Sequence, residues 1–209
     1  FNRAAELSLL LTIPCTVALV VIPSALVSVL FERGAFVASD TQATALATAI
    51  YGLGLPAFVL QKLYQPVFFA REDTRSPFNF ALVALVVNAV VAIGLSRYIG
   101  FTAAAYGATC AGWAMLACLW WGARRFGAAA SWDAQLRKRS FRILLASLVM
   151  GAVVWITARA LEPVLQMAGL LLLGLAVILG VAGLSYALAG RLLGAFSLAQ
   201  LRQMIRRAD

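Results

Sequence analysis

The chain alternates long apolar runs with short polar segments, and this pattern predicts membrane-spanning helices. A bilayer core needs about 20 consecutive apolar residues in a helix. Six segments are long enough, at residues 7–31, 41–61, 78–96, 99–123, 141–160 and 163–190. Pro14 and Pro23 fall within the first segment and predict a bend there. The pattern therefore predicts an all-α, polytopic integral membrane protein with six transmembrane helices.

The second predicted helix contains the clearest signal for a kink. Three residues that weaken a helix lie in its middle: Gly52, Gly54 and Pro56. Proline lacks a backbone N–H and clashes with the carbonyl four residues back, so we expect a kink or a partial unwinding near Gly52. A bilayer tolerates such a break only where neighbouring helices or a cavity satisfy the freed backbone groups.

Four charged residues follow this helix within five positions: Arg71, Glu72, Asp73 and Arg75. Charged groups are costly in hydrocarbon, so this elbow is expected to be a tight loop at one membrane face. Pro77 suits the first turn of the next helix. Two interpretations stay open: a salt-bridged turn that ties two helices together, or a charged gate that breaks when a transporter switches faces.

Two patterns predict close contacts between helices. Ala103, Gly107 and Ala111 recur every four residues in the fourth helix, and such a seam of small residues lets another helix approach closely. Asn88 is the strongly polar residue inside the third helix. It either bonds a neighbouring helix or lines a cavity.

Lys62 is the central candidate for a polar substrate path. Intramembrane charges usually face a cavity or a partner, which favours a substrate role for Lys62. Its ammonium is also near enough to the elbow to reach the membrane interface by snorkelling, so both interpretations stay open. The candidate residues of a substrate path are Lys62, Gln61 and Asn88. Tyr51, Tyr64 and Gln65 lie on or near the same helix as Lys62.

The order of these features divides the chain into four parts. Residues 1–123 hold four transmembrane helices, residues 124–140 form a basic loop lying against anionic headgroups, and residues 141–190 form a further helix pair. Residues 191–209 predict an amphipathic helix, because Leu198, Leu201 and Ile205 share one face and arginines cover the other.

Composition and charge support this assignment and fix an orientation. Hydrophobic residues make up 63% of the chain and charged residues 12%, about half the usual share of a soluble domain. The net charge is +9, but the basic residues lie between apolar runs, which argues against a nucleic-acid-binding surface. Fourteen of the seventeen Lys and Arg residues fall in alternate loops, so the positive-inside rule places those loops and both ends in the cytoplasm.

The sequence offers no constellation for catalysis or metal binding. There is no histidine, and every Asp or Glu lies in a loop or at a helix end. Cys15, Cys110 and Cys118 lie in apolar runs, as buried hydrophobic residues do. We therefore predict a protein that is not an enzyme and that has no metal site and no cofactor.

Two stretches carry a family resemblance. The GLGLP of residues 52–56, Lys62 and the FFAREDTRSP of residues 68–77 resemble the MurJ (MviN) family of lipid II flippases, as does FERGAF at residues 31–36. The resemblance covers all 209 residues as the last six of about fourteen helices. The chain begins without Met or a signal peptide, so we expect it to be part of a longer protein.

The resemblance implies a partial lobe of a MATE-like transporter of the MOP superfamily. Such a protein moves lipid II, the lipid-linked peptidoglycan precursor, from the inner to the outer leaflet by alternating access during cell-wall biosynthesis. Its implied partners are a polyprenyl-linked glycolipid, membrane lipids and N-terminal transporter helices missing from this chain. Two alternatives remain, an exporter of another polyprenyl-linked polysaccharide precursor and a membrane scaffold subunit.

The resemblance also implies a groove for the substrate's lipid tail between the last two helices. The corresponding candidates here are Val149, Val153, Leu171 and Leu175. The family's pyrophosphate-binding arginines belong to helices upstream of this chain, so no arginine is assigned that role.

Overall fold

The computed structural model describes residues 1–31, 38–162 and 171–195, and all of its regular elements are helices. The elements are α1 (Asn2–Val21), α2 (Pro23–Phe31), α3 (Ala38–Phe69), α4 (Arg75–Ile99), α5 (Thr102–Ala123), the 3-10 helix η1 (Arg124–Ala130), α6 (Ala134–Ala160) and α8 (Leu171–Leu192). Within these residues, six helices are long and apolar enough to cross a membrane. The prediction of an all-α protein with six transmembrane helices is confirmed.

The first predicted span is broken, as its prolines indicated. Ile22 separates α1 from α2 with a non-helical backbone (φ −126°, ψ 41°), directly before Pro23. A residue that precedes proline is pushed out of the α region by the proline ring, which explains the position of the break. Pro14 is accommodated inside α1.

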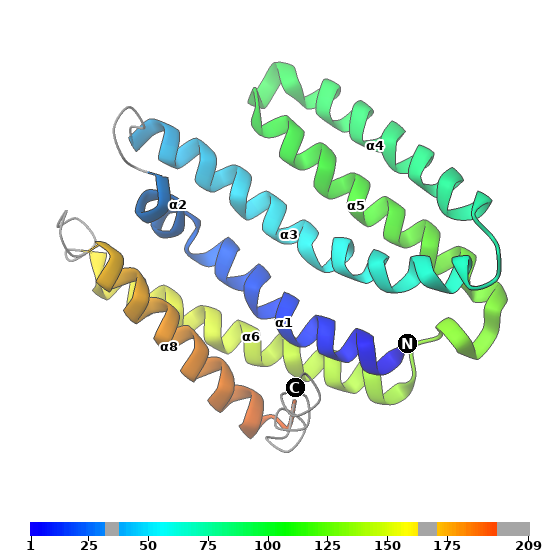
Figure 1. The fold of residues 1–209 in the computed structure, drawn as a ribbon. Helices are drawn as coiled ribbons and strands as arrows, with labels where there is room; N and C mark the ends of the chain where they lie inside the picture. Colours follow the sequence, from blue (N-terminus) through cyan, green and yellow to red (C-terminus); the bar gives the residue numbers. More distant parts are fainter. Residues whose placement is uncertain (32–37, 163–170, 196–209) are drawn as a thin grey trace.

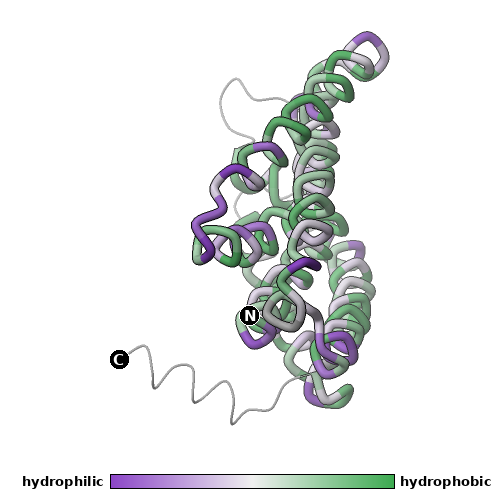
Figure 2. The backbone as a smooth tube through the Cα atoms, turned by 90° about the vertical axis from the view of Figure 1, so that its right-hand side faces the viewer, coloured by the Kyte–Doolittle hydropathy of each residue, from purple (hydrophilic) through white to green (hydrophobic). Residues whose placement is uncertain are grey.

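The long helices form a row in which each packs on its neighbours, in the order α4, α5, α3, α1, α6 and α8 (Figure 1). Long helices that follow one another in the chain run in opposite directions (Figure 1). Consequently the start of α1, the α3–α4 turn, η1, the start of α6 and the end of α8 lie at one end, which we call the basic end. Hydrophilic stretches gather at turns and helix ends, and apolar residues cover the helix bodies (Figure 2).

Helix α3 runs without interruption through the group of helix-weakening residues. The backbone is helical at Gly52, Gly54 and Pro56, so the partial unwinding is not observed. The axis of α3 changes direction partway along its length (Figure 1). Gly52 is buried against α1, because a Cβ there would lie 2.9 Å from the Leu19 Cβ. Packing on α1 thus supports this part of the helix, while the kink at these three residues stays a prediction.

Most of the basic segment at 124–140 is helical, so the prediction of a loop over this whole range was wrong. Residues 124–130 form η1, and α6 begins at Ala134, so the basic run lies in the first turns of a helix. The Asp133 carboxylate caps α6 by accepting a hydrogen bond of 2.6 Å from the Leu136 N–H. Leu136 is itself fully buried. Capping and this buried anchor extend the helix beyond the apolar run that the pattern detected.

Three apolar clusters hold the described helices together, and the smallest joins Leu10, Ile143 and Ala195. The largest one joins α1, α3 and α5 around Leu60, Tyr64, Phe68 and Leu119. Another joins the α1–α2 break, α6 and α8 through Ile22, Met150, Val154, Ile178 and Ala182. The last two helices therefore pack on α1 and α2 as well as on each other.

The small-residue seam of α5 packs on α4, as predicted. Ala103, Gly107 and Ala111 are buried, and a Cβ at Gly107 would lie only 2.5 Å from the Asn88 Oδ1 of α4. The amphipathic helix expected at 191–209 lies outside the described residues from position 196 onward, and so does most of the FERGAF stretch.

Candidate functional site

An apolar groove of about 1080 Å³ lies among α1, α3, α5 and α6. Leu53 and Pro56 of α3, Trp113 and Trp120 of α5, and Leu144 of α6 are among its lining residues. Both tryptophans are more than 40% exposed along this surface. The groove is concave, and hydrocarbon and indole groups provide nearly all of its surface.

Polar groups of the groove are concentrated toward the basic end. The Trp132 indole N–H donates a hydrogen bond of 2.7 Å to the Tyr64 hydroxyl, and both side chains line the groove. Arg137 and Ser140, from the first turns of α6, complete this part of the lining. The groove therefore combines an apolar body with a cationic rim.

The predicted substrate-path residues are not brought together. The Gln61 amide donates a hydrogen bond of 2.6 Å to the Gly112 carbonyl, which ties α3 to α5. Asn88 lies at the α4–α5 contact beside Gly107. Lys62 is exposed, and none of the three lines the apolar groove. Asn88 and Gln61 thus occupy helix contacts, and a transport role for any of the three stays a prediction.

The lipid-tail candidates do not share one environment. Val149 is 49% exposed, whereas Leu175 is only 7% exposed. Val153 and Leu171 are half-buried. All four belong to the packed pair α6 and α8, and none of them lines the apolar groove. Their assignment to a lipid-binding surface stays a prediction.

The elbow after α3 is tied to η1 by charge and by aromatic contacts. Arg125 pairs with the Asp73 carboxylate and donates a hydrogen bond of 2.9 Å to the Ser76 hydroxyl. The Arg71 guanidinium lies 4.4 Å from the centre of the Phe126 ring. These contacts match the interpretation as a salt-bridged turn, in which Arg125 of η1 bonds the turn between α3 and α4. The gate interpretation for Arg71, Glu72, Asp73 and Arg75 stays a prediction.

The ionised form of Asp73 is favoured at this elbow. Its pKa lies below the usual range, first because the carboxylate accepts a 3.0 Å hydrogen bond from the Ser76 backbone N–H, and also because of the Ser76 hydroxyl and Arg125. A lowered pKa means that the stabilisation is present above the unfolded-state pKa. It is lost as the pH falls through the folded-state pKa, so the elbow contact is intact at neutral pH.

Glu72 turns the chain out of α3. Among the described residues, Glu72 is the one residue other than glycine that has a positive φ, 58°. This left-handed conformation costs a side-chain-bearing residue about 1–2 kcal/mol and lets the Asp73 N–H reach the Phe68 carbonyl at 3.1 Å. A carbonyl in the last turn of α3 is therefore hydrogen-bonded at the expense of local backbone strain.

A second ion pair joins α1 to α6 at the basic end. Arg139 contacts Glu6 at 2.7 Å, and the two side chains are 26% and 15% exposed. We expect a double-mutant cycle with Glu6→Gln and Arg139→Gln to give a coupling of about 1 kcal/mol, near the upper end for accessible pairs, because both groups are largely withdrawn from water. Chemical denaturation of the unmodified protein, the two single variants and the double variant measures this coupling free energy. Additive single-variant effects would contradict the coupling.

Sequence reasoning missed the apolar groove, although a signal for it exists. Trp113, Leu116, Ala117 and Trp120 share one face of α5 at helical spacing. Similar apolar stripes occur on α1, α3 and α6, the other helices that line the groove. Apolar residues cover every face of such helices, so the pattern does not distinguish a groove from a lipid-facing surface.

These features define a class: a polytopic membrane protein built as a row of spanning helices with a large apolar groove, a transporter-like architecture without a catalytic constellation among its described residues. The particular family follows from comparison with known proteins. The family model described as "Lipid II flippase MurJ" matches residues 1–173. The chain belongs to the MurJ family.

Curated relatives and a solved structure agree with this assignment. The chain is 36% identical over 211 residues to a probable lipid II flippase MurJ of Rhizobium tropici, covering 99% of this chain and 39% of that protein. It is 38% identical over 161 residues to the one from Rhizobium meliloti, covering 74% and 29%. A structure titled "Lipid II flippase MurJ, inward closed conformation" has a TM-score of 0.75 at 22% identity, covering 91% of this chain and 38% of that chain, and shows that the fold is shared. The chain thus spans about two fifths of the length of the first of these relatives.

Proposed function

We propose that this chain forms part of a lipid flippase that moves lipid II from the inner to the outer leaflet by alternating access, in peptidoglycan biosynthesis. The observation that carries the proposal is the family match over residues 1–173, which includes the first five candidate spans. The described acidic residues lie at helix ends and turns, in keeping with transport rather than covalent chemistry.

The basic end is assigned to the cytoplasmic side of the bacterial inner membrane. The contacts between Glu6 and Arg139 and between Arg142 and Gly194 bring the start of α1, the start of α6 and the end of α8 to this end. The elbow and η1 contribute their arginines to the same end. Clustered Lys and Arg residues favour the cytoplasmic face. Both ends of the chain are cytoplasmic in this orientation.

The apolar groove is proposed to be a packing surface. Helices of the same transporter that lie outside this chain would fill it. Its relatives are much longer than the chain, and the groove is concave, apolar and about 1080 Å³ in volume. In a bilayer, helices associate through close van der Waals packing, which a concave apolar surface provides. The chain then supplies part of one lobe, and the polyprenyl-linked substrate moves between that lobe and the rest of the protein.

Complementation tests the proposal. The full-length gene is expected to restore growth to cells depleted of their own lipid II flippase and to prevent accumulation of lipid-linked precursor. The 209-residue chain, expressed to the same level, is expected not to restore growth, because it spans only part of the length of its relatives. Failure of a well-expressed full-length protein would redirect the assignment to export of another polyprenyl-linked precursor.

A further inference from the structure

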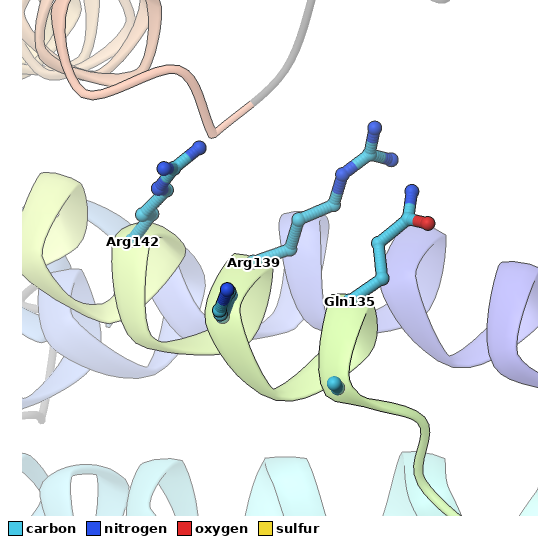
Figure 3. Close-up of a pocket in the computed structure, with 5 residues that line it drawn as sticks. Gln135, Arg139 and Arg142 are labelled. Atoms are coloured by element: carbon cyan, nitrogen blue, oxygen red, sulfur yellow. The ribbon is translucent and has the colours of Figure 1, made fainter.

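A second cavity, separate from the apolar groove, lies on the first two turns of α6. It has a volume of about 310 Å³ and is lined by Ala134, Gln135, Lys138, Arg139 and Arg142. The last four residues are spaced by three, one and three positions, so they share one face of the helix. Figure 3 shows Gln135, Arg139 and Arg142 projecting from this face of α6. We call this cavity the basic cleft.

Neighbouring elements hold two of its cations in place. Arg139 is bound to Glu6 of α1 at 2.7 Å, and the Arg142 guanidinium donates a 3.3 Å hydrogen bond to the Gly194 carbonyl after α8. Lys138 is exposed. Three cations face a single carboxylate, which leaves the cleft with a net charge of about +2, and Gln135 adds an uncharged amide donor.

The position of the basic cleft along α6 places it at the boundary between polar and apolar surface. Arg142 is the last charged residue of α6 before Arg159, and the sixteen residues between them are uncharged. Leu145, one turn beyond Arg142 on the same side of the helix, is 36% exposed. Trp132 just precedes the helix, and tryptophan is typical of the membrane interface. The cations therefore sit at headgroup level directly above an apolar surface.

We propose that the basic cleft binds the phosphate of an anionic glycerophospholipid of the surrounding bilayer. The phosphodiester carries one negative charge and accepts hydrogen bonds from the Arg142 guanidinium and the Lys138 ammonium. The Gln135 amide donates to the glycerol or phosphate oxygens, and the acyl chains follow the apolar surface beyond Leu145. The bound lipid bridges α6 to the end of α8. This inference does not depend on which lipid the transporter moves.

Lipid binding to the purified full-length protein tests the proposal. Native mass spectrometry in detergent, with a titration of phosphatidylglycerol or of phosphatidylcholine with the same acyl chains, measures the affinity for each. The unmodified protein is expected to prefer phosphatidylglycerol. The double variant Lys138→Gln/Arg142→Gln is expected to bind it about 30-fold more weakly, with phosphatidylcholine binding unchanged, because two interfacial cations are removed.

Two further variants separate the basic cleft from general charge effects. Arg3→Gln/Arg124→Gln removes two exposed cations at the same end of the bundle but outside the cleft, and is expected to keep the affinity. Lys138→Arg/Arg142→Lys keeps the charge and is expected to keep most of the binding, which also shows that altered cleft residues are compatible with folding. Undiminished phosphatidylglycerol binding in Lys138→Gln/Arg142→Gln, or an equal loss in Arg3→Gln/Arg124→Gln, overturns the proposal.

Competition distinguishes a bilayer lipid from other anions. Millimolar glycerol 3-phosphate is expected not to displace phosphatidylglycerol, because it lacks the acyl chains. Displacement by it would assign the basic cleft to a soluble anion. Displacement by equimolar undecaprenyl pyrophosphate would assign it to a polyprenyl-linked lipid, and either result overturns the proposal.

Discussion

Replacement of Gly107 by leucine is expected to detach α4 from α5 and to lower the thermal stability of the protein sharply. A Cβ at Gly107 would lie 2.5 Å from the Asn88 Oδ1, 2.9 Å from the Asn88 backbone oxygen and 3.0 Å from the Ala92 Cβ. The backbone oxygen cannot rotate away, so α4 must move. We expect a loss of about 3 kcal/mol or more, at the upper end for overpacked contacts, measured as a lowered Tm in detergent.

The architecture makes this contact decisive for α4. This helix stands at one end of the row and packs mainly on α5. Among its described residues, only Pro77 is buried. Few other contacts are therefore available to hold α4 once the seam is opened. The prediction concerns the tertiary position of α4, because its backbone hydrogen bonds are internal to the helix.

Gly94 provides a matched control in α4 itself. A Cβ at this position meets nothing within 4 Å. Gly94→Leu is expected to leave Tm unchanged or to raise it slightly, because leucine favours a helix over glycine by about 0.8 kcal/mol. Equal destabilisation by Gly94→Leu and Gly107→Leu would show that the effect comes from the added leucine and not from the α4–α5 contact.

The number and order of the spanning helices could be predicted from the sequence, because uncharged length is a direct consequence of bilayer thickness. The small-residue seam could be predicted for a similar reason. Spacing by four residues places Ala103, Gly107 and Ala111 on one face whatever the tertiary structure. The break before Pro23 follows from local stereochemistry.

Features that depend on tertiary contacts could not be predicted in the same way. The charges of the basic run end the apolar pattern and so predict a loop, whereas the Asp133 cap and the buried Leu136 make the run helical. The sequence makes Gln61 a candidate for a polar path but does not reveal that its amide meets the Gly112 carbonyl of a helix 51 residues away. A lone polar side chain within an apolar helix gives no information about which neighbouring backbone it will reach.

Replacement of Ala117 by tryptophan is expected to abolish the proposed flippase function of the full-length protein. Ala117 is an exposed residue that lines the apolar groove, between Trp113 and Trp120 on the same face of α5. If further helices of the transporter fill this groove, the added indole must displace them. The expected cost is about 1–3 kcal/mol of folding free energy, with failure to complement flippase-depleted cells. Tm in detergent and precursor accumulation measure the two effects.

Ala176→Trp is the control that isolates the groove. Ala176 is an exposed alanine of α8, the helix at the opposite end of the row from α4, and it does not line the groove. A tryptophan there meets lipid, which adapts to its shape, so both stability and complementation are expected to persist. If Ala117→Trp is tolerated as well as Ala176→Trp, the groove also faces lipid and the assignment to packed helices is wrong. If Ala117→Trp abolishes complementation without lowering Tm, the groove is open in the assembled protein, and an apolar part of the transported lipid becomes its occupant.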